Sequence, residues 1–136
     1  DPNTGFSLND KSVKIWGVEP INSAFMKASL AAGRLVEIRE KPTLADAVAG
    51  GMEPEAVTFP LCQAYVDGIM TVSENALKNA MRRLYEVHAK IVEGAGALPL
   101  AGLVKARRQF QGRTAVLVVS GGNISAALFK TLARRK

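Results

Sequence analysis

The chain has 136 residues, of which 48% are hydrophobic, and a formal net charge of +6. This length and composition fit one globular domain with a sizeable core. No apolar run approaches the roughly 20 residues of a membrane helix, and the first residues lack the basic start and apolar stretch of a signal peptide. We therefore expect a cytoplasmic protein with no membrane partner.

Cysteine usage and charge clustering limit the kinds of site. Cys62 is the only cysteine, so it can form neither an internal disulfide nor a CxxC pair, and we interpret it as a small core residue. Basic residues cluster at 82–83, 105–108 and 134–136 without the interleaved aromatic residues of a single-strand binder. Solvated helix faces explain these clusters better than a nucleic-acid partner does.

The first regular elements are a strand and a helix. Alternating residues over 13–18 indicate a strand, which ends at Glu19 because a proline follows. The Glu19 carboxylate therefore stands at the carboxyl end of a predicted strand. A helix as far as residue 32 follows, with Asn22 or Ser23 as its N-cap.

The middle of the chain is less regular. Prolines and glycines interrupt residues 41–58, which we interpret as a functional or connecting loop with a short helical turn at 44–48. A helix is predicted over 59–66 and a second short strand over 69–72.

Ser73 is predicted to cap the longest helix. Apolar residues recur at spacings of three and four from 76 to 92, which is typical of an amphipathic helix that packs on a core. His88 lies at the edge of that apolar stripe, and the chain has no second histidine for an imidazole metal site. We therefore predict a partly buried structural histidine.

Small residues interrupt the pattern after this helix. Residues 93–97 form a Gly/Ala junction that lets the backbone come close to another group, although such junctions usually only pack tightly. A helix over about 97–108 follows, with Pro99 tolerated in its first turn. A last helix is predicted over 124–132.

Residues 115–119 form an unbroken apolar run rich in β-branched side chains. This pattern is typical of a strand buried on both faces of a parallel sheet. The run stops at Ser120, so its hydroxyl should stand at the carboxyl end of a central strand, beside a glycine turn. In open α/β sheets that edge is where ligands bind.

Helices thus alternate with three predicted strands, which end at the polar residues Glu19, Ser73 and Ser120. Short strands separated by helical crossovers make an α/β fold with a parallel sheet. Three strands are few for a sheet covered on both faces, so we expect that part of the fold is missing.

Five motifs in order resemble the carboxyl-terminal half of the pyridoxal-phosphate threonine/serine dehydratases, which have the tryptophan synthase β-like fold (fold type II). The resemblance implies part of a parallel three-layer sheet domain. Residues 1–136 would form the carboxyl-terminal portion of the large cofactor-binding domain, with 1–12 as a loop or frayed end. The motifs are residues 17–20, 43–46, 58–62 with 66–73, 92–97 and 120–124.

The resemblance also implies a site for pyridoxal 5'-phosphate. In this family a serine at the position of Ser120 hydrogen-bonds the pyridine nitrogen, and a neutral hydroxyl suits β-elimination better than transamination. Glu93 corresponds to a glutamate near the cofactor, with Gly94 in a close wall beside it and Gly121 next to the serine. Ala47 stands where the family has a glycine that permits close backbone approach.

A cation site follows from the same resemblance. Relatives with a divalent cation use a glutamate like Glu19 and a backbone carbonyl like that of Ser23 as ligands. Phe25 stands where an acidic ligand is expected, and its side chain cannot bind a hard cation. The resemblance thus makes Glu19 and Ser23 the candidate ligands of a divalent or monovalent cation, and Phe25 counts against that site.

Two parts of the family's machinery do not occur in the sequence. The lysine that binds the cofactor comes from a Ser-x-Lys-x-Arg-like segment in relatives, and the phosphate is held by a tetraglycine loop; neither motif is present. We therefore expect a fragment or one half of a split chain, inactive alone, with the missing amino-terminal half as its partner.

When complete, the enzyme is expected to be an ammonia-lyase that converts a small hydroxy amino acid to a 2-oxo acid and ammonia, as a homo-oligomer. An amino-acid racemase or another β-eliminating lyase of the same fold is the nearest alternative. A non-catalytic interaction module and a basic nucleic-acid-binding module are alternatives from other classes.

Overall fold

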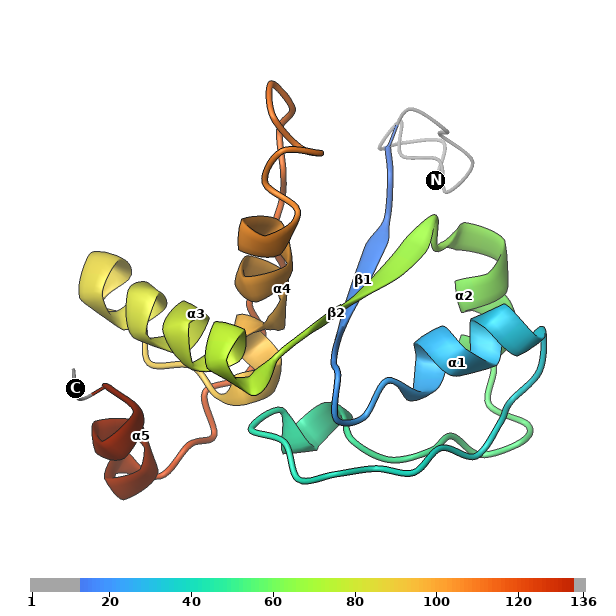
Figure 1. Cartoon of the computed structure of the whole chain (residues 1–136), viewed down its shortest axis with the longest axis horizontal. Helices are drawn as coiled ribbons and strands as arrows, with labels where there is room; N and C mark the ends of the chain where they lie inside the picture. Colours follow the sequence, from blue (N-terminus) through green and yellow to red (C-terminus); the bar gives the residue numbers. More distant parts are fainter. Residues whose placement is uncertain (1–12, 134–136) are drawn as a thin grey trace, which may run out of the picture.

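The computed structural model describes residues 13–133, and the expectations for residues 1–12 and for the basic cluster at 134–136 lie outside that range. Figure 1 shows the order of the elements. They are β1 (Trp16–Pro20), α1 (Phe25–Ala32), the 3-10 helix η1 (Asp46–Val48), α2 (Thr58–Tyr65), β2 (Gly68–Val72), α3 (Glu74–His88), α4 (Gly94–Lys105) and α5 (Ala126–Ala133).

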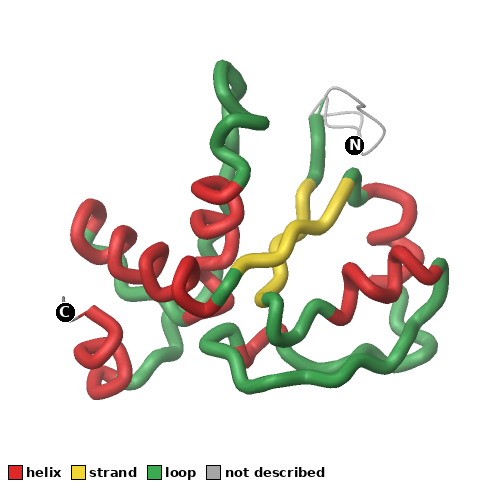
Figure 2. The backbone as a smooth tube through the Cα atoms, in the orientation of Figure 1, coloured by secondary structure: helices red, strands yellow, loops and turns green. Residues whose placement is uncertain are grey.

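The two strands form a parallel pair, in register from Trp16 opposite Gly68 to Pro20 opposite Val72. α4 packs on both strands, and α1 and α2 lie on the other side of the pair (Figure 2). The crossover between the strands contains α1, η1 and α2, as parallel pairing requires. Within residues 13–133 no helix is both long enough and apolar enough to cross a bilayer.

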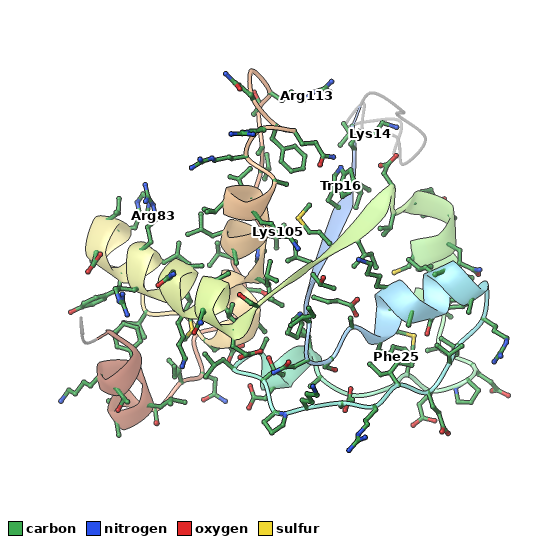
Figure 3. All side chains as sticks on the ribbon, viewed as in Figure 1. Lys14, Trp16, Phe25, Arg83, Lys105 and Arg113 are labelled. Atoms are coloured by element: carbon green, nitrogen blue, oxygen red, sulfur yellow. The ribbon has the colours of Figure 1, made fainter. Side chains whose placement is uncertain are left out.

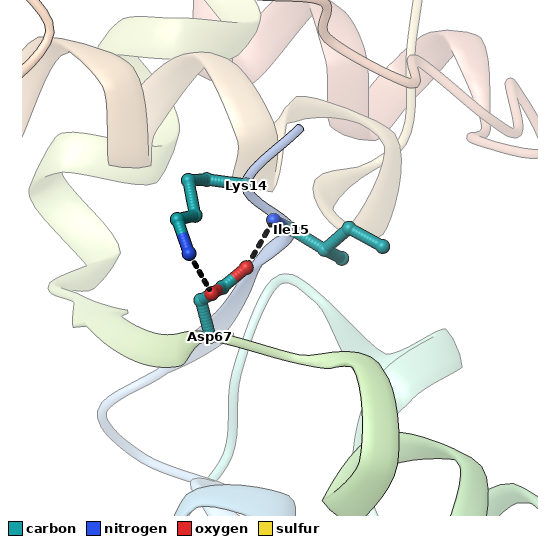
Figure 4. A network of polar contacts seen from close by, with 3 residues as sticks. All are labelled: Lys14, Ile15 and Asp67. Atoms are coloured by element: carbon teal, nitrogen blue, oxygen red, sulfur yellow. Dashed lines mark hydrogen bonds and ion pairs between the residues drawn. The ribbon is translucent and has the colours of Figure 1, made fainter. Parts of the chain in front are cut away.

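β1 begins three residues later than predicted and includes Glu19. The residues before it are held by Asp67, whose carboxylate accepts hydrogen bonds from Lys14 Nζ at 2.9 Å and from the Ile15 amide at 2.8 Å (Figure 4). Asp67 directly precedes β2. This contact therefore fixes where the two strands begin relative to each other.

The prediction that Asn22 or Ser23 caps α1 is wrong. The N-cap position is Ala24, which makes no side-chain cap. The Glu19 carboxylate instead accepts hydrogen bonds from the amides of Met26 and Lys27 at 2.8 and 2.9 Å. A carboxylate that satisfies free amides at a helix start is favourable both as a hydrogen-bond acceptor and as a negative charge near the positive end of the helix.

α2 forms within one residue of its predicted bounds, but it lies outside the core. None of its eight residues is buried. Cys62, in the middle of this helix, is half-buried. The prediction that Cys62 is a core residue is therefore wrong, because the helix that carries it lies at the surface of the described fold.

The predicted β2 strand and its following helix are confirmed. The Ser73 hydroxyl accepts from the Ala76 amide at 3.3 Å and so caps α3. The inner face of α3 is buried at spacings of three and four, and it packs on α4 to form the main core. Its buried residues are Leu77, Ala80, Met81 and Leu84.

α3 ends earlier than the apolar stripe suggests. Ala89 adopts a left-handed conformation with φ of 52°, which turns the chain away from the helix axis. Val87 and Ile91 are consequently exposed, whereas Val92 returns to the core. His88 is exposed, so the prediction of a partly buried histidine is wrong.

α4 starts at Gly94, not near Ala97, and Pro99 is its sixth residue instead of lying in the first turn. Glycine is a poor helix former in isolation. Here tertiary packing overrides that preference, because the start of α4 is buried against backbone from two other segments. Ala97, Leu98 and Ala101 belong to the core that α4 shares with α3.

The prediction of a buried strand over 115–119 is wrong. This segment forms no strand, and Val116 and Val118 are 86% and 73% exposed. Among the described residues the sheet has two strands instead of three. A strand needs a neighbour to receive its hydrogen bonds, and no part of residues 13–133 pairs with this run.

α5 begins and ends close to the predicted positions. Its buried contact is Phe129, whose ring meets Tyr85 of α3 edge to face with 5.0 Å between the centroids. Ala127 and Leu128, by contrast, are both exposed. An aromatic pair therefore joins α5 to α3.

The predicted basic clusters belong to different elements. Figure 3 shows Arg83 on α3 and Arg113 in the loop beyond α4. The ammonium of Lys105 donates a hydrogen bond to the Thr71 carbonyl at 2.6 Å. One member of the predicted clusters thus joins α4 to β2.

Candidate functional site

The first turn of α4 is the meeting point of two segments that are far apart in the sequence. At Gly94, a β-carbon would overlap with the Leu44 carbonyl and the Ala45 amide. At Gly96, a β-carbon would overlap with the Ser120 carbonyl. Because both positions lack side chains, the backbones of residues 43–48 and 120–124 can lie against the same turn of helix.

Ser120 and Glu93 stand on either side of Gly121. Gly121 has φ of 79°, in the left-handed region, and its α-carbon lies against the Glu93 carboxylate. Glu93 is the N-cap residue of α4, so its negative charge is at the positive end of the helix. These contacts bring Ser120, Gly121, Glu93 and Gly94 into one cluster.

The Ser120 side chain is exposed, and its hydroxyl makes no hydrogen bond to any described residue. Only its backbone carbonyl is packed, against Gly96. The strand expected before Ser120 does not form within residues 13–133. The serine nevertheless directly precedes Gly121, which packs on Glu93. A hydroxyl in this position is free to bind a polar atom of a ligand.

Ala47 lies in η1, which packs on α4, and Figure 1 shows this short teal helix below the strands. It is exposed. Its amide donates to Asp46 Oδ1 at 3.0 Å, so the turn is stabilised locally. Gly94, by contrast, is buried under Leu44, so it shapes the site by admitting that backbone.

Sequence reasoning missed Glu74, the first residue of α3. Its carboxylate accepts a hydrogen bond from the Thr43 hydroxyl at 2.7 Å and another from the Leu44 amide at 2.8 Å. The available signal was an acidic residue directly after the Ser73 cap. The glutamate of a capping box is the third residue of its helix and accepts a hydrogen bond from the N-cap amide. Glu74 is the first residue of α3, so its carboxylate can instead bind a neighbouring segment.

The proposed cation ligands have other roles. Both Glu19 oxygens accept backbone amides of α1. The buried Ser23 hydroxyl donates to Glu40, which also accepts from the Gly50 amide at 2.8 Å. These hydrogen bonds lower the pKa of the Glu40 carboxyl, with Ser23 as the main cause.

Hard cations require several oxygen ligands with negative charge among them. In the described part of the chain, no three His, Cys, Asp or Glu side chains gather to hold a metal ion. Glu19 is the single carboxylate of the expected ligand set, and it is engaged by α1. The residues present therefore do not fit a divalent cation, and no chemical step is derived from one.

Residues 4–121 match the family model of pyridoxal-phosphate dependent enzymes. The chain belongs to this family. The match includes Glu93, Gly94, Ser120 and Gly121 of the cluster at α4 and ends before residues 122–124.

Relatives within the family agree with this assignment. The chain is 38% identical over 118 residues to an L-threonine ammonia-lyase of Thermotoga maritima, and 37% identical over 124 residues to one of Geobacter sulfurreducens. These stretches are 87% and 90% of this chain but 29% and 30% of those proteins. The chain thus spans less than a third of the length of these relatives.

Solved structures of the family have the same fold. The threonine deaminase of T.th. has a TM-score of 0.77 and 38% identity, covering 85% of this chain and 37% of that one. Maize serine racemase has a TM-score of 0.78 and 26% identity, covering 90% of this chain and 39% of that one. The chain therefore has the α/β architecture of the fold type II pyridoxal-phosphate enzymes, with a parallel sheet.

Proposed function

We propose that this chain provides part of the cofactor site of a pyridoxal-phosphate-dependent ammonia-lyase that acts on a small hydroxy amino acid. The observation that carries the proposal is the cluster at the first turn of α4, where Ser120, Gly121 and Glu93 meet beside the segment that contains Ala47. Proteins named L-threonine ammonia-lyase among the relatives support the reaction class.

The residues of the cluster fit the cofactor by the chemistry of their atoms. The Ser120 hydroxyl is exposed and unbonded within the described range, so it can hydrogen-bond the pyridine nitrogen without supplying a charge. Bound pyridoxal phosphate acts as an electron sink for the bond-breaking at the substrate's α-carbon. A neutral partner at the pyridine nitrogen leaves the ring a weaker electron acceptor, which favours β-elimination over transamination.

Glu93 and the turn at Gly121 would form the wall beside this hydroxyl. The carboxylate lies against the Gly121 backbone, so it limits the conformations of the residue that follows Ser120. Ala47 and the η1 backbone would close the opposite side. Since the family's lysine and tetraglycine motifs do not occur in the sequence, we propose that a further polypeptide segment provides them, and that the complete enzyme is a homo-oligomer.

An amino-acid racemase of the same fold is the second candidate. The maize serine racemase structure, with a TM-score of 0.78, is as similar in backbone as the threonine deaminase is. Its sequence identity of 26% is lower than the 38% of the threonine deaminase. The lyase is therefore the preferred proposal.

An assay of both reactions tests the proposal. The protein is combined with pyridoxal phosphate and with the amino-terminal segment of a family member that carries the lysine and the glycine loop. L-Threonine and L-serine are added separately, and 2-oxo acid, ammonia and the D-enantiomer are measured. Oxo acid and ammonia in equal amounts support the lyase, and D-amino acid without ammonia supports the racemase.

Cofactor binding provides the independent control. A change in the cofactor's absorption on adding this chain, which in Ser120→Ala needs a higher cofactor concentration, is expected whether or not turnover follows. If the spectrum of pyridoxal phosphate is the same with and without the chain in the mixture, and no product forms, the proposal is wrong.

A further inference from the structure

Glu74 connects the carboxyl end of β2 to the segment that contains Ala47. It is the first residue of α3, directly after Ser73. Its two carboxylate oxygens have different partners, the Thr43 hydroxyl at 2.7 Å and the Leu44 amide at 2.8 Å. Both contacts are partly buried and span about thirty residues of sequence, so they are tertiary contacts and not part of a local turn.

Thr43 extends this connection. Its hydroxyl donates to Glu74 and accepts from the Ala45 amide at 3.2 Å. One carboxylate and one hydroxyl thus bind the backbone amides of two successive residues, Leu44 and Ala45. Hydrogen bonds to a charged acceptor are stronger than those between neutral groups, which makes Glu74 the dominant partner.

The same stretch of backbone is also packed against α4. Gly94 lies on the Leu44 carbonyl and the Ala45 amide, and Ala45 is completely buried. The first residue of α3 thus binds the amide of Leu44, and the first residue of α4 packs on the peptide group that follows it. η1, with Asp46 and Ala47, begins at the next residue, so its position follows from this peptide.

We infer that Glu74 is a positioning residue that holds residues 43–48 against the start of α4 and thereby sets where Ala47 faces the cofactor. The effect on Ala47 and the cofactor rests on the proposed function. The first step, in which Glu74 holds residues 43–48 against α4, concerns the fold alone and has its own test. Glu74 acts through Thr43 and Leu44 and is not assigned any contact with the cofactor.

A purely helical role for Glu74 must be separated from this one, because a carboxylate in the first turn also stabilises its own helix. The two roles differ in their dependence on Thr43. If Glu74 acts through the Thr43 hydroxyl, Glu74→Gln and Thr43→Val have non-additive effects. If it acts on the α3 helix only, Glu74→Gln has the same effect in the Thr43→Val variant as in the unsubstituted protein.

Amide hydrogen exchange measures the first step. In Glu74→Gln, exchange at Leu44 and Ala45 is expected to accelerate about tenfold, as the loss of a charge-assisted hydrogen bond predicts. Amides in the middle of α3, such as that of Met81, serve as the internal reference and should not change. Thr43→Val should accelerate exchange at the same two amides, and Thr43→Ser, which retains the hydroxyl, should restore their protection.

Glu55→Gln is the matched control. Glu55 is exposed and its side chain has no hydrogen bond within the described part of the chain, so the same loss of charge should leave exchange at Leu44 unchanged. Unchanged exchange at Leu44 and Ala45 in both Glu74→Gln and Thr43→Val would overturn the inference. Additive effects of the two substitutions would do the same.

Cofactor affinity tests the second step in the protein supplied with the lysine-bearing segment. Glu74→Gln is expected to weaken pyridoxal phosphate binding several-fold, and Thr43→Ser to leave it near the unsubstituted value. If exchange changes but the unsubstituted protein binds no cofactor, the proposed function fails while the positioning of 43–48 by Glu74 stands. If the unsubstituted protein binds the cofactor and Glu74→Gln binds it equally well, the link from Glu74 to the cofactor is wrong and the proposed function stands.

Discussion

The α-carbon of Gly96 lies directly against the carbonyl oxygen of Ser120, and a β-carbon at residue 96 would overlap with that oxygen. The group in the way is backbone, so it cannot move aside by a change of rotamer. This contact holds the end of an otherwise exposed segment on the most buried part of α4. The position of the Ser120 hydroxyl therefore depends on the absence of a side chain at residue 96.

Gly96→Ala is expected to destabilise the protein by about 2 kcal/mol, the typical cost of forcing an extra carbon into a packed site. Urea unfolding monitored by circular dichroism measures the change in the free energy of unfolding. Gly51→Ala is the control, because a β-carbon there would meet the Phe25 ring at an ordinary 3.7 Å. Equal stability of both variants would show that the 120–124 segment does not pack on Gly96.

Ser120→Ala is expected to weaken binding of pyridoxal phosphate about fivefold, since one hydrogen bond contributes about 1 kcal/mol, and to lower turnover further. Spectroscopic titration gives the dissociation constant. Thr114→Ala removes another exposed hydroxyl, which makes no hydrogen bond within residues 13–133, and should leave binding unchanged. Equal affinities of the Ser120→Ala and unsubstituted proteins would remove the serine from the cofactor site.

Acid stability should depend on Asp67. The Lys14 ammonium, which binds its carboxylate, holds the pKa of Asp67 below its usual range, and the Ile15 amide adds to this effect. The folded protein therefore binds fewer protons at this group than the unfolded chain does. The resulting stabilisation is complete above the unfolded pKa of about 3.9 and is lost as the pH falls through the lower folded value.

Asp67→Asn should accordingly be less stable than the unsubstituted protein at pH 7 and should lose less stability between about pH 5 and 3. Urea unfolding at a series of pH values measures both effects. The Glu40 carboxyl, whose pKa is also lowered, should preserve part of the acid sensitivity. High salt should reduce the difference at pH 7, because the Lys14–Asp67 pair is partly exposed. Parallel pH profiles of the two proteins would contradict the assignment.

Phe129→Ala should release α5 from α3. The Phe129 side chain is 6% exposed and packs on Tyr85, so its removal eliminates the aromatic contact between α5 and α3. We expect amides of α5 to lose protection in hydrogen exchange while those of α3 keep it. The neighbouring Leu128 is 46% exposed, and Leu128→Ala should change little. Loss of protection throughout α3 would show instead that α5 and α3 unfold together.

The amino-acid sequence was sufficient to determine those elements that depend on only a few neighbouring residues. β2 followed from a short run of apolar and β-branched residues, and the Ser73 cap from a hydroxyl before a helix. The apolar face of α3 followed from apolar residues at spacings of three and four. Gly33 ends α1 in the left-handed conformation expected of a helix C-cap. The order of five short motifs also sufficed to recognise the family, since a motif depends on residue identity and not on packing.

Tertiary structure alone decided which segments meet. The sequence of residues 115–119 has the composition of a buried strand, but a strand forms only where a neighbour pairs with it, and Val116 is instead 86% exposed. Glu19 looked like a ligand and caps α1, while Glu74, whose place directly after the Ser73 cap names no partner, binds Thr43 and Leu44. A carboxylate's partner is set by long-range geometry, which no spacing along the chain encodes.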